Sequence, residues 1–292
     1  MTQTRTIRLM GGLGNQLFQV AGGLHLTATT GVRSRFDRSW FDDAHRGGDT
    51  TRSFETDVVL RPAERSALPR WKSRLAYAGH NPLHFTQPDA NDMTIDHLPP
   101  RIRWLRGYFQ RAEYPLSVID QLASRLLPVL DSSSTADDAA GAIGLHIRLG
   151  DYLSQPHTQD FHGVTPPEYF VEALRSLRTT PDTELLVFTD SPDIVERDYL
   201  PHLQGHARIA PTRPAWETLN DLSRCAAIVM SNSSLSWWSA FVATELRRER
   251  TRVIKPVPWF ARPSLADTAL SIEGWVDLPR ITRSGPQVPR AQ

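Results

Sequence analysis

The sequence of 292 residues is poor in several features whose absence excludes whole classes of protein. Its one cysteine, Cys225, allows neither an intrachain disulfide nor a metal site built from several cysteines. We expect Cys225 to be a small buried residue. No stretch approaches the ~18 apolar residues of a membrane span, and residues 1–10 lack the apolar run of a signal peptide. These absences predict a cytoplasmic location.

An excess of charge of one sign is also missing. Lys+Arg 33 nearly balance Asp+Glu 32, which leaves a net charge of +1, and the only lysines are Lys72 and Lys255. Without a strong overall field, the net charge is not expected to hold either nucleic acid or an anionic membrane. The pattern Asp-x-Asp does not occur, and the ten histidines show no His-Glu-x-x-His spacing. We therefore expect no bound metal.

What remains is an ordinary globular composition, 40% hydrophobic and 22% charged, long enough for two domains. The polar segment 131–138 is small and near the midpoint, so it is interpreted as a linker or exposed loop. This predicts an N-terminal α/β domain over residues 1–138 and a C-terminal α/β domain over 139–283. Residues 284–292 are expected to form a flexible tail.

The second half alternates between strand and helix patterns. Strands are predicted at 142–147, 184–189, 226–230 and 252–254. Helices are predicted at 192–200, around 216–222 and at 235–246, and a further helix is expected to begin after Thr165, which would be its N-cap. Such alternation indicates a parallel, doubly wound sheet. The first half gives a strand at 6–10, a glycine-rich turn and a helix at 16–29, and residues 61–103 stay unassigned. We expect two Rossmann-type α/β domains facing a cleft.

Glycines stand between the first predicted strand and the first predicted helix, in the run Gly-Gly-Leu-Gly-Asn-Gln over residues 11–16. Glycine lets the backbone approach a ligand, and the helix N-terminus favours an anion. The pattern is neither G-x-G-x-x-G nor a P-loop. A tight strand-to-helix turn without ligand is an equally good interpretation.

A second segment, residues 146–152, follows the strand at 142–147. The carboxyl edge of such a sheet is where ligands bind, and strand alternation places His146 and Arg148 on one face. The guanidinium of Arg148 suits a phosphate. The alternative is a structural ion pair between Arg148 and Asp151.

Two further turns can hold polar ligands. Ser231, Asn232, Ser233 and Ser234 follow the strand at 226–230, and hydroxyls with free N–H groups at a helix N-terminus form an anion site. Ordinary serine capping is the alternative. Asp190 ends the strand at 184–189 and is interpreted either as a ribose or base contact or as part of a capping turn. Trp237 and Trp238 are expected to be core residues rather than a sugar-stacking platform.

Together and in this order, these segments closely resemble the bacterial α-1,2-fucosyltransferase family, glycosyltransferase family 11. The family's GGLGNQLFQ-like segment is matched by residues 11–19, H-x-R-R-G-D-Y by 146–152, F-S/T-D by 188–190 and N-S-S-F-S-W-W by 232–238. Residues 256–259 match its later Pro-x-x-Trp. The resemblance spans about residues 6–260.

The resemblance implies a GT-B-like fold, GDP-fucose as donor, a β-galactoside glycan as acceptor, no metal, and inverting transfer to form an α-1,2 fucoside. It places the acceptor side in the domain over 1–138, with the glycine-rich loop, and GDP-sugar binding in the domain over 139–283. It implies that His146 contacts guanine or ribose, Arg148 the β-phosphate, and Ser233 and Ser234 the diphosphate. Asn15, with Gly12 and Gly14, would reach the sugar phosphate from the other domain. Asp190 and Asn232 complete the expected nucleotide site, and Arg148, Asp151 and Asn15 are the expected catalytic residues.

Three positions depart from the family pattern. Leu149 stands where many relatives have a second arginine, so Arg148 alone can be the phosphate fork. Leu235 replaces phenylalanine in the tryptophan signature. Relatives often carry an acid near the position of Thr218, where this chain has the adjacent Glu217.

Several alternatives stay open at this point. The general base could be Asp151, Glu168 or His162, or none if the transition state is dissociative. A nicotinamide-dependent oxidoreductase, a non-catalytic glycan-binding module and a transferase using another GDP-sugar are the competing functions. The acceptor could be a lipid-linked repeat unit, a free oligosaccharide or a small metabolite. A lipid-linked acceptor would bring the protein into peripheral contact with the inner membrane.

Overall fold

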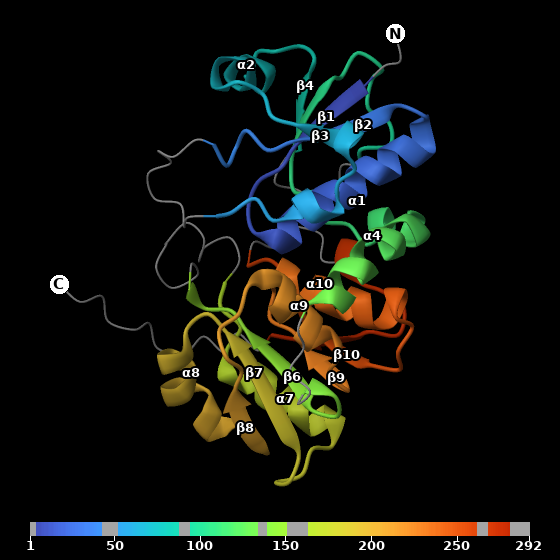
Figure 1. The fold of residues 1–292 in the computed structure, drawn as a ribbon. Coiled ribbons are helices and arrows are strands. Elements are labelled where there is room, and N and C mark those ends of the chain that lie inside the picture. The colour runs from blue at the N-terminus through green and yellow to red at the C-terminus, as the bar shows by residue number, and fades with distance from the viewer. Residues whose placement is uncertain are drawn as a thin grey trace, which may run out of the picture.

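The computed structural model describes residues 4–42, 52–87, 94–133, 139–150, 163–261 and 268–280, which form an α/β protein with two sheets (Figure 1). Within those ranges the first sheet has five strands in the order β3-β2-β1-β5-β4 and the second has six in the order β11-β10-β9-β6-β7-β8. Every paired strand runs parallel to its neighbour. The expected GT-B-like architecture of two Rossmann-type parallel sheets is confirmed.

The first half carries the smaller sheet and the helices that cover it. Its elements are β1 (Thr4–Arg8), α1 (Leu13–Thr30), β2 (Arg33–Asp37), η1 (Thr56–Val59), η2 (Pro62–Glu64), β3 (Arg65–Ser66), α2 (Arg70–Ala76), β4 (His84–Thr86), β5 (Trp104–Arg106), α3 (Glu113–Ser117) and α4 (Ile119–Ser132). The strand predicted at 6–10 lies two residues earlier. The first helix begins at Leu13, three residues before the predicted start, and ends where Gly31 adopts a left-handed conformation (φ 70°).

The second half contains the larger sheet. Its elements are β6 (Ile143–Ile147), α7 (Pro167–Leu177), β7 (Glu184–Thr189), α8 (Pro192–Asp198), η4 (Leu200–His202), β8 (His206–Ile209), α9 (Ala215–Ser223), β9 (Ala227–Val229), α10 (Ser234–Phe241), η5 (Val242–Leu246), β10 (Arg252–Val257), η6 (Thr268–Leu270) and β11 (Val276–Pro279). The predicted strands and helices of this half are present at or near their expected positions.

Some sequence predictions for this half were wrong. The edge strands β8 and β11 were missed, because both are short and largely exposed and so lack an apolar run. The helix α7 is capped at Pro166, not Thr165, whose hydroxyl instead donates to the Asn232 Oδ1 at 3.1 Å. The helix predicted at 235–246 changes at Val242 from α-helical α10 to the π-helical turn η5.

The predicted linker at 131–138 begins inside a helix. Asp131 and Ser132 belong to α4, and the Asp131 carboxylate pairs with Arg224 at 3.6 Å and with Arg247 at 3.4 Å in the second half. Residues 134–138 and the predicted tail at 284–292 lie outside the described residues.

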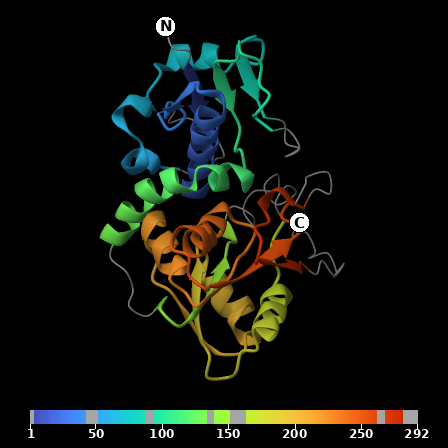
Figure 2. The same cartoon turned by 90° about the vertical axis from the view of Figure 1, so that its right-hand side faces the viewer.

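A layer of helices connects the two sheets. Figures 1 and 2 both show α1 and α4 on the side of the first sheet that faces α9 and α10. One hydrophobic cluster runs through this layer, from Ile7 and Leu17 through Leu126 to Leu222 and Phe241. A second cluster lies under α7 and α8 on the other face of the larger sheet. The two halves therefore share a packed core rather than a bare hinge.

Candidate active site

The predicted site residues with described positions come from two regions that meet in space: the carboxyl edge of the larger sheet and the start of α1. The strands β9, β6 and β7 are neighbours and parallel, so the residues that follow them lie at one sheet edge. The start of α1 lies against the start of α10: a Cβ added to Gly14 would lie 2.5 Å from the carbonyl carbon of Ser234. This contact brings the glycine-rich turn of the first half to the serine-rich turn of the second.

Arg148 and Asp190 form an ion pair at this edge. The Arg148 Nη1 lies 3.0 Å from the Asp190 Oδ2, and the two side chains are 23% and 24% exposed. The alternative partner, Asp151, lies outside the described residues. The ion pair holds the Arg148 guanidinium at the carboxyl edge of the sheet, and part of the Arg148 side chain stays accessible to solvent.

The Asp190 carboxylate also organises the turn after β6. Its Oδ1 accepts backbone N–H bonds from Leu149 at 3.0 Å and Gly150 at 3.2 Å, and its Oδ2 accepts from Gly150 at 3.1 Å. A Cβ at Gly150 would lie 2.4 Å from this Oδ2. Gly150 of the H-x-R-x-G-D segment is therefore explained by the closeness of Asp190, which leaves no room for a side chain. The contacts of Asp190 favour a role in positioning Arg148 and the turn after β6.

His146 lies two residues before Arg148, within β6, and is buried, with 5% of its surface exposed. Its Nδ1 lies 3.1 Å from the Ser231 Oγ, and its carbonyl accepts the Ser231 N–H at 3.0 Å. Burial, with a smaller contribution from the Arg148 charge, lowers the pKa of His146 to about 4, although Asp190 acts in the opposite direction. The imidazole is therefore neutral at physiological pH and can give or accept a hydrogen bond without carrying charge.

Asn232 is buried, and its side chain bonds to protein groups on two loops. Its Oδ1 accepts from the Thr165 hydroxyl, and its Nδ2 donates to the Trp259 carbonyl at 3.2 Å and to the Gly163 carbonyl at 3.4 Å. These bonds connect the tryptophan of the Pro-x-x-Trp segment to the N-S-S segment. They favour a role for Asn232 in shaping the turn.

Ser233 occupies the N-cap of α10 without capping it. Its backbone is extended (φ −115°, ψ 130°), and within the described residues its side chain makes no capping hydrogen bond. The Ser236 hydroxyl instead donates back to the carbonyls of Ser233 at 2.9 Å and Ser231 at 3.2 Å, which leaves the first N–H groups of α10 without a side-chain cap among the described residues. The Ser233 hydroxyl and the first N–H groups of α10 are thus suited to meet an anion.

The glycine-rich turn places Asn15 beside the loop after β5. The Asn15 Oδ1 accepts from the Gln110 Nε2 at 2.8 Å, and its Nδ2 lies 2.7 Å from the position of a Cβ on Gly11, whose φ is +78°. Gly12 is the extended N-cap of α1, and a Cβ there would lie 3.8 Å from the Arg52 Nη1. Arg52 is therefore a further cation next to this turn.

The two glutamines of the same motif have a structural role that the sequence analysis did not predict. The Gln16 Nε2 donates to the carbonyls of Gly11 at 3.0 Å and Ser53 at 2.9 Å, and its Oε1 accepts from the Glu55 N–H at 3.0 Å. Gln19 links the Met10 N–H to the Gly107 carbonyl, both at 3.0 Å. The sequence feature that could have indicated this role is the position of Gln16 and Gln19 inside the matched segment 11–19. Buried amides of this kind fix loops from distant parts of the sequence.

The segment that Gln16 holds also contacts the second half. The Trp216 Nε1 of α9 donates to the Glu55 carbonyl at 2.9 Å. Burial raises the pKa of the Glu55 carboxyl, opposed by a hydrogen bond from Ser53 and by the Arg52 charge. Glu217, the acid adjacent to the family's position, pairs instead with Arg213 at 3.4 Å.

Of the three candidate bases, only Glu168 has a described position. It is exposed on the first turn of α7, and its charge helps to raise the pKa of Tyr199, after burial and Asp198. Asp151 and His162 lie outside the described residues.

The aromatic signature and the cysteine are core residues, as predicted. Trp237, Trp238 and Cys225 are each 0% exposed, and burial raises the pKa of the Cys225 thiol to about 12. The tryptophans pack on Phe18 of α1, with ring centroids 4.6 Å and 5.3 Å apart.

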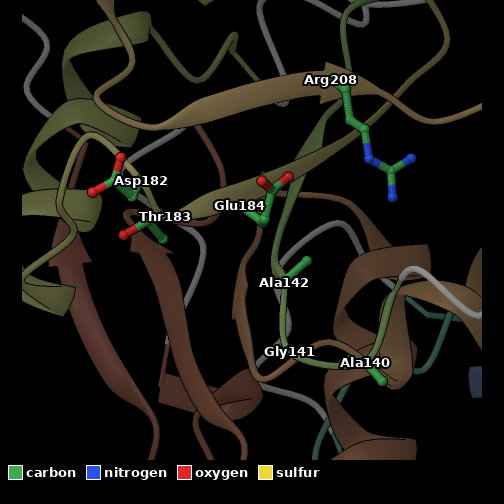
Figure 3. A pocket seen from close by; sticks show the side chains of 7 residues that line it. All are labelled: Ala140, Gly141, Ala142, Asp182, Thr183, Glu184 and Arg208. Atoms are coloured by element: carbon green, nitrogen blue, oxygen red, sulfur yellow. The ribbon is translucent and has the colours of Figure 1, made fainter.

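A hollow of about 630 Å³ lies elsewhere, lined by residues that precede or belong to β6, β7 and β8 (Figure 3). Asp182 and Glu184 stand at the start of β7, which is the amino edge of the sheet. Because ligands of such sheets bind at the carboxyl edge, this hollow is not the candidate active site.

Two structural features bear on cofactors and membranes. In the part of the chain that the structure describes, no three His, Cys, Asp or Glu side chains gather as metal ligands would. None of the described helices combines the length and the apolarity needed to cross a bilayer.

Comparison with known proteins finds relatives along almost the whole chain. The chain is 26% identical to an Escherichia coli protein named O-antigen biosynthesis glycosyltransferase WbnK, over 92% of this chain and 99% of that protein. It is 24% identical to an Escherichia coli α-1,2-colitosyltransferase, over 92% of this chain and 97% of that protein. Among solved structures, E. coli heptosyltransferase WaaC with ADP is similar with a TM-score of 0.46 and 10% identity, over 95% of this chain and 93% of that one.

A family comparison covers more than half of the chain. Residues 87–278 match the family described as glycosyl transferase family 11. That range includes β6 with Arg148, β7 with Asp190, and the start of α10 with Ser233. The chain therefore belongs to glycosyl transferase family 11 and is a glycosyltransferase.

Proposed function

We propose that this protein transfers L-fucose from GDP-β-L-fucose to the 2-hydroxyl of a β-galactoside glycan, with inversion at the anomeric carbon. The observation that carries the proposal is a set of three donor groups on segments that direct contacts join at the carboxyl edge of the larger sheet: the Ser231 N–H donates to the His146 carbonyl, and Gly14 lies against Ser234. The three groups are the partly exposed guanidinium of Arg148, the uncapped N-terminus of α10 at Ser233, and the glycine-rich start of α1, which packs against Ser234.

The chemistry needs such donors. Breaking the bond between sugar and diphosphate builds positive charge on the sugar and negative charge on departing GDP. Arg148 offers a planar fork to a phosphate, and the helix terminus offers N–H groups with a favourable dipole. Asp190 fixes the guanidinium before the donor binds, so less reorganisation is needed in the transition state.

The remaining roles follow the same proposal. His146 would contact the guanine or ribose as a neutral ring, and Asn15 with Gly12 would approach the sugar phosphate from the first half. Gly14 would contribute by letting α1 approach Ser234, and Asn232 by holding the turn before α10 through its bonds to Thr165 and Trp259. Asp151, Glu168 or His162 would accept the proton of the acceptor hydroxyl, or a dissociative reaction would need only a weak base.

We also propose that no metal takes part, because protein donors can stabilise the leaving group. The proposed location is the cytoplasm, where GDP-sugars are made. A lipid-linked repeat unit is a suitable acceptor, since one relative is named for O-antigen biosynthesis.

A second donor is favoured by a specific observation. One relative is named as an α-1,2-colitosyltransferase. Colitose lacks the 3-hydroxyl of fucose, so both GDP-sugars present the same diphosphate to Arg148 and Ser233. The two candidates therefore differ only in the pocket around the sugar ring.

The test is a panel of GDP-fucose, GDP-colitose and GDP-mannose with a β-galactoside acceptor, read by the mass and linkage of the product. An α-1,2 fucoside supports the first proposal, and a colitoside alone supports the second. GDP binding is measured in parallel: at ~100 times Kd it should raise stability by about 2.7 kcal/mol, a shift of several degrees in Tm. If GDP gives no shift while NAD does, the GDP-sugar proposal is wrong.

A further inference from the structure

The short helix α2 has its large apolar residues on the outside. Trp71 is 66% exposed and Leu75 is 60% exposed, whereas Ser73 and Ala76 are each 4% exposed. Trp71 and Leu75 are four residues apart, so they lie on one face of the helix. Small side chains therefore attach this helix to the protein, and the two large ones face solvent.

The inner face of α2 is fixed by specific contacts. The Ser39 hydroxyl donates to the Ser73 Oγ at 2.8 Å, and the guanidinium of Arg8 lies 4.7 Å from the ring centroid of Tyr77, directly after the helix. The exposure of Trp71 and Leu75 is thus a consequence of how the helix is anchored. Two exposed apolar residues side by side on one short helix mark an interaction surface.

Basic residues surround this apolar pair. Arg70, Lys72 and Arg74 are exposed on the same seven-residue helix, which contains no acidic residue. A Trp and a Leu flanked by Lys and Arg are the features of a segment that lies in the interface of an anionic bilayer. Each basic side chain beside such a surface strengthens binding about five-fold.

The positive charge of α2 also indicates which kind of partner can bind its exposed face. A second copy of the same face would bring three positive charges against three others, which opposes a symmetric dimer. Figure 1 shows α2 projecting from the first half, at the end of the molecule away from the larger sheet. A flat anionic surface can reach this helix without meeting the second half.

We propose that α2 is a membrane-docking helix that binds anionic phospholipid through Trp71 and Leu75, with Arg70, Lys72 and Arg74 supplying the electrostatic attraction. The surface belongs to the half expected to hold the acceptor, so docking would bring the protein to a lipid-linked acceptor. That consequence rests on the proposed function, but the lipid binding itself does not.

The experiment is cosedimentation of the full chain, without donor or acceptor, with vesicles of phosphatidylethanolamine and phosphatidylglycerol, and with pure phosphatidylcholine as a comparison. We expect binding to the anionic vesicles that weakens with salt. Trp71→Ser with Leu75→Ser should lower the partition coefficient at least ten-fold, and Lys72→Glu with Arg74→Glu should lower it further. The matched control is Val58→Ser with Val276→Ser, which removes two apolar residues outside α2 of similar exposure (60% and 52%) and should bind as wild type.

Unchanged Tm values establish that the variants are folded. The proposal is overturned if the wild-type chain does not bind anionic vesicles, or if the α2 and control variants bind alike. It is also overturned if the α2 substitutions only convert a dimer to a monomer, which would make this face an interface between copies. Transfer to a water-soluble acceptor should be unaffected by the α2 substitutions, so a failure here is distinguishable from a failure of the proposed transfer reaction.

Discussion

Phe18 of α1 packs against Trp237 of α10, with ring centroids 4.6 Å apart and an angle of 44° between the rings. Each residue belongs to one of the two most distinctive sequence segments of the chain. Four residues earlier in α1, Gly14 meets the backbone of Ser234. The segments therefore share a single interface, and part of what they encode is packing rather than chemistry.

Gly14 should not tolerate a methyl group. An alanine Cβ would lie 2.5–2.6 Å from the Ser234 carbonyl carbon and the Leu235 nitrogen, and backbone atoms cannot rotate away. We expect Gly14→Ala to destabilise the protein by ~1–3 kcal/mol and to displace α1 from α10, which would lower kcat/KM. Thermal melting and kinetics measure both effects.

Gly79→Ala is the matched control, because a Cβ there meets nothing within 4 Å. It should melt and turn over as wild type. A Gly14→Ala protein with unchanged Tm and kinetics would show that the contact has no energetic importance.

Arg148→Lys should separate catalysis from structure. The ion pair with Asp190 keeps its charge, but lysine lacks the planar fork. Loss of a transition-state donor costs ~3–4 kcal/mol, so kcat should fall at least ~100-fold while Tm stays near wild type. Arg197→Lys, in an exposed ion pair with Asp198, serves as control. Near-normal turnover by folded Arg148→Lys protein would exclude Arg148 from catalysis.

Ser233 and Ser236 should respond in opposite ways to removal of the hydroxyl. Ser233→Ala loses no capping bond, so Tm should hold while KM for the GDP-sugar rises about ten-fold, because a hydrogen bond to a charged group is lost. Ser236→Ala loses the single buried hydroxyl proton that the carbonyls of Ser233 and Ser231 share, and should lower Tm by roughly 2–4 °C. Equal effects of the two substitutions on KM and on Tm would contradict these assignments.

His146 should make stability depend on pH below neutrality. Its pKa is about 4 in the folded protein against 6.5 as the reference value, so between these values the unfolded chain binds more protons. The free energy of unfolding should therefore fall as the pH decreases from 6.5 to about 4, by ~3 kcal/mol from this group. Above pH 6.5 both states are neutral and the contribution does not change.

His146→Gln removes that ionisation. Denaturant unfolding at a series of pH values should give a shallower decline for the variant than for wild type. Parallel curves would mean that the imidazole is not held neutral by burial.

Transfer should not require a divalent metal. We expect turnover to survive excess EDTA, because Arg148 and the α10 terminus can stabilise the departing GDP. Product formation is measured with and without the chelator. Activity abolished by EDTA and restored by Mg²⁺ or Mn²⁺ would contradict the proposed metal independence.

Local patterns were enough to predict most of the larger sheet. Buried strands such as β6 and β7 are short apolar runs, and the helices between them repeat apolar residues at helical spacing. The same patterns imply a parallel sheet, and hence an edge that carries Arg148, Asp190 and Ser233. The family was also evident from the order of the motifs.

The sequence could not decide which partner each polar group chooses. Arg148 pairs with Asp190, 42 positions away, and the side chain of Gln16 holds a segment near Glu55. It also left residues 61–103 unassigned, because β3, β4 and α2 are short and lack a buried apolar face of their own. Long-range pairing depends on which elements pack together, and local spacing carries little information about that.

The sequence by itself thus determined the fold class, the family and the chemical types of the candidate site. Only the tertiary structure decided that Gly14 and Phe18 are contacts to α10, that the Ser236 hydroxyl donates to the carbonyl of Ser233, and that Trp71 faces solvent. The physical reason is that composition and periodicity act along the chain. Burial, hydrogen-bond satisfaction and ion pairing are settled only when distant segments compete for the same space.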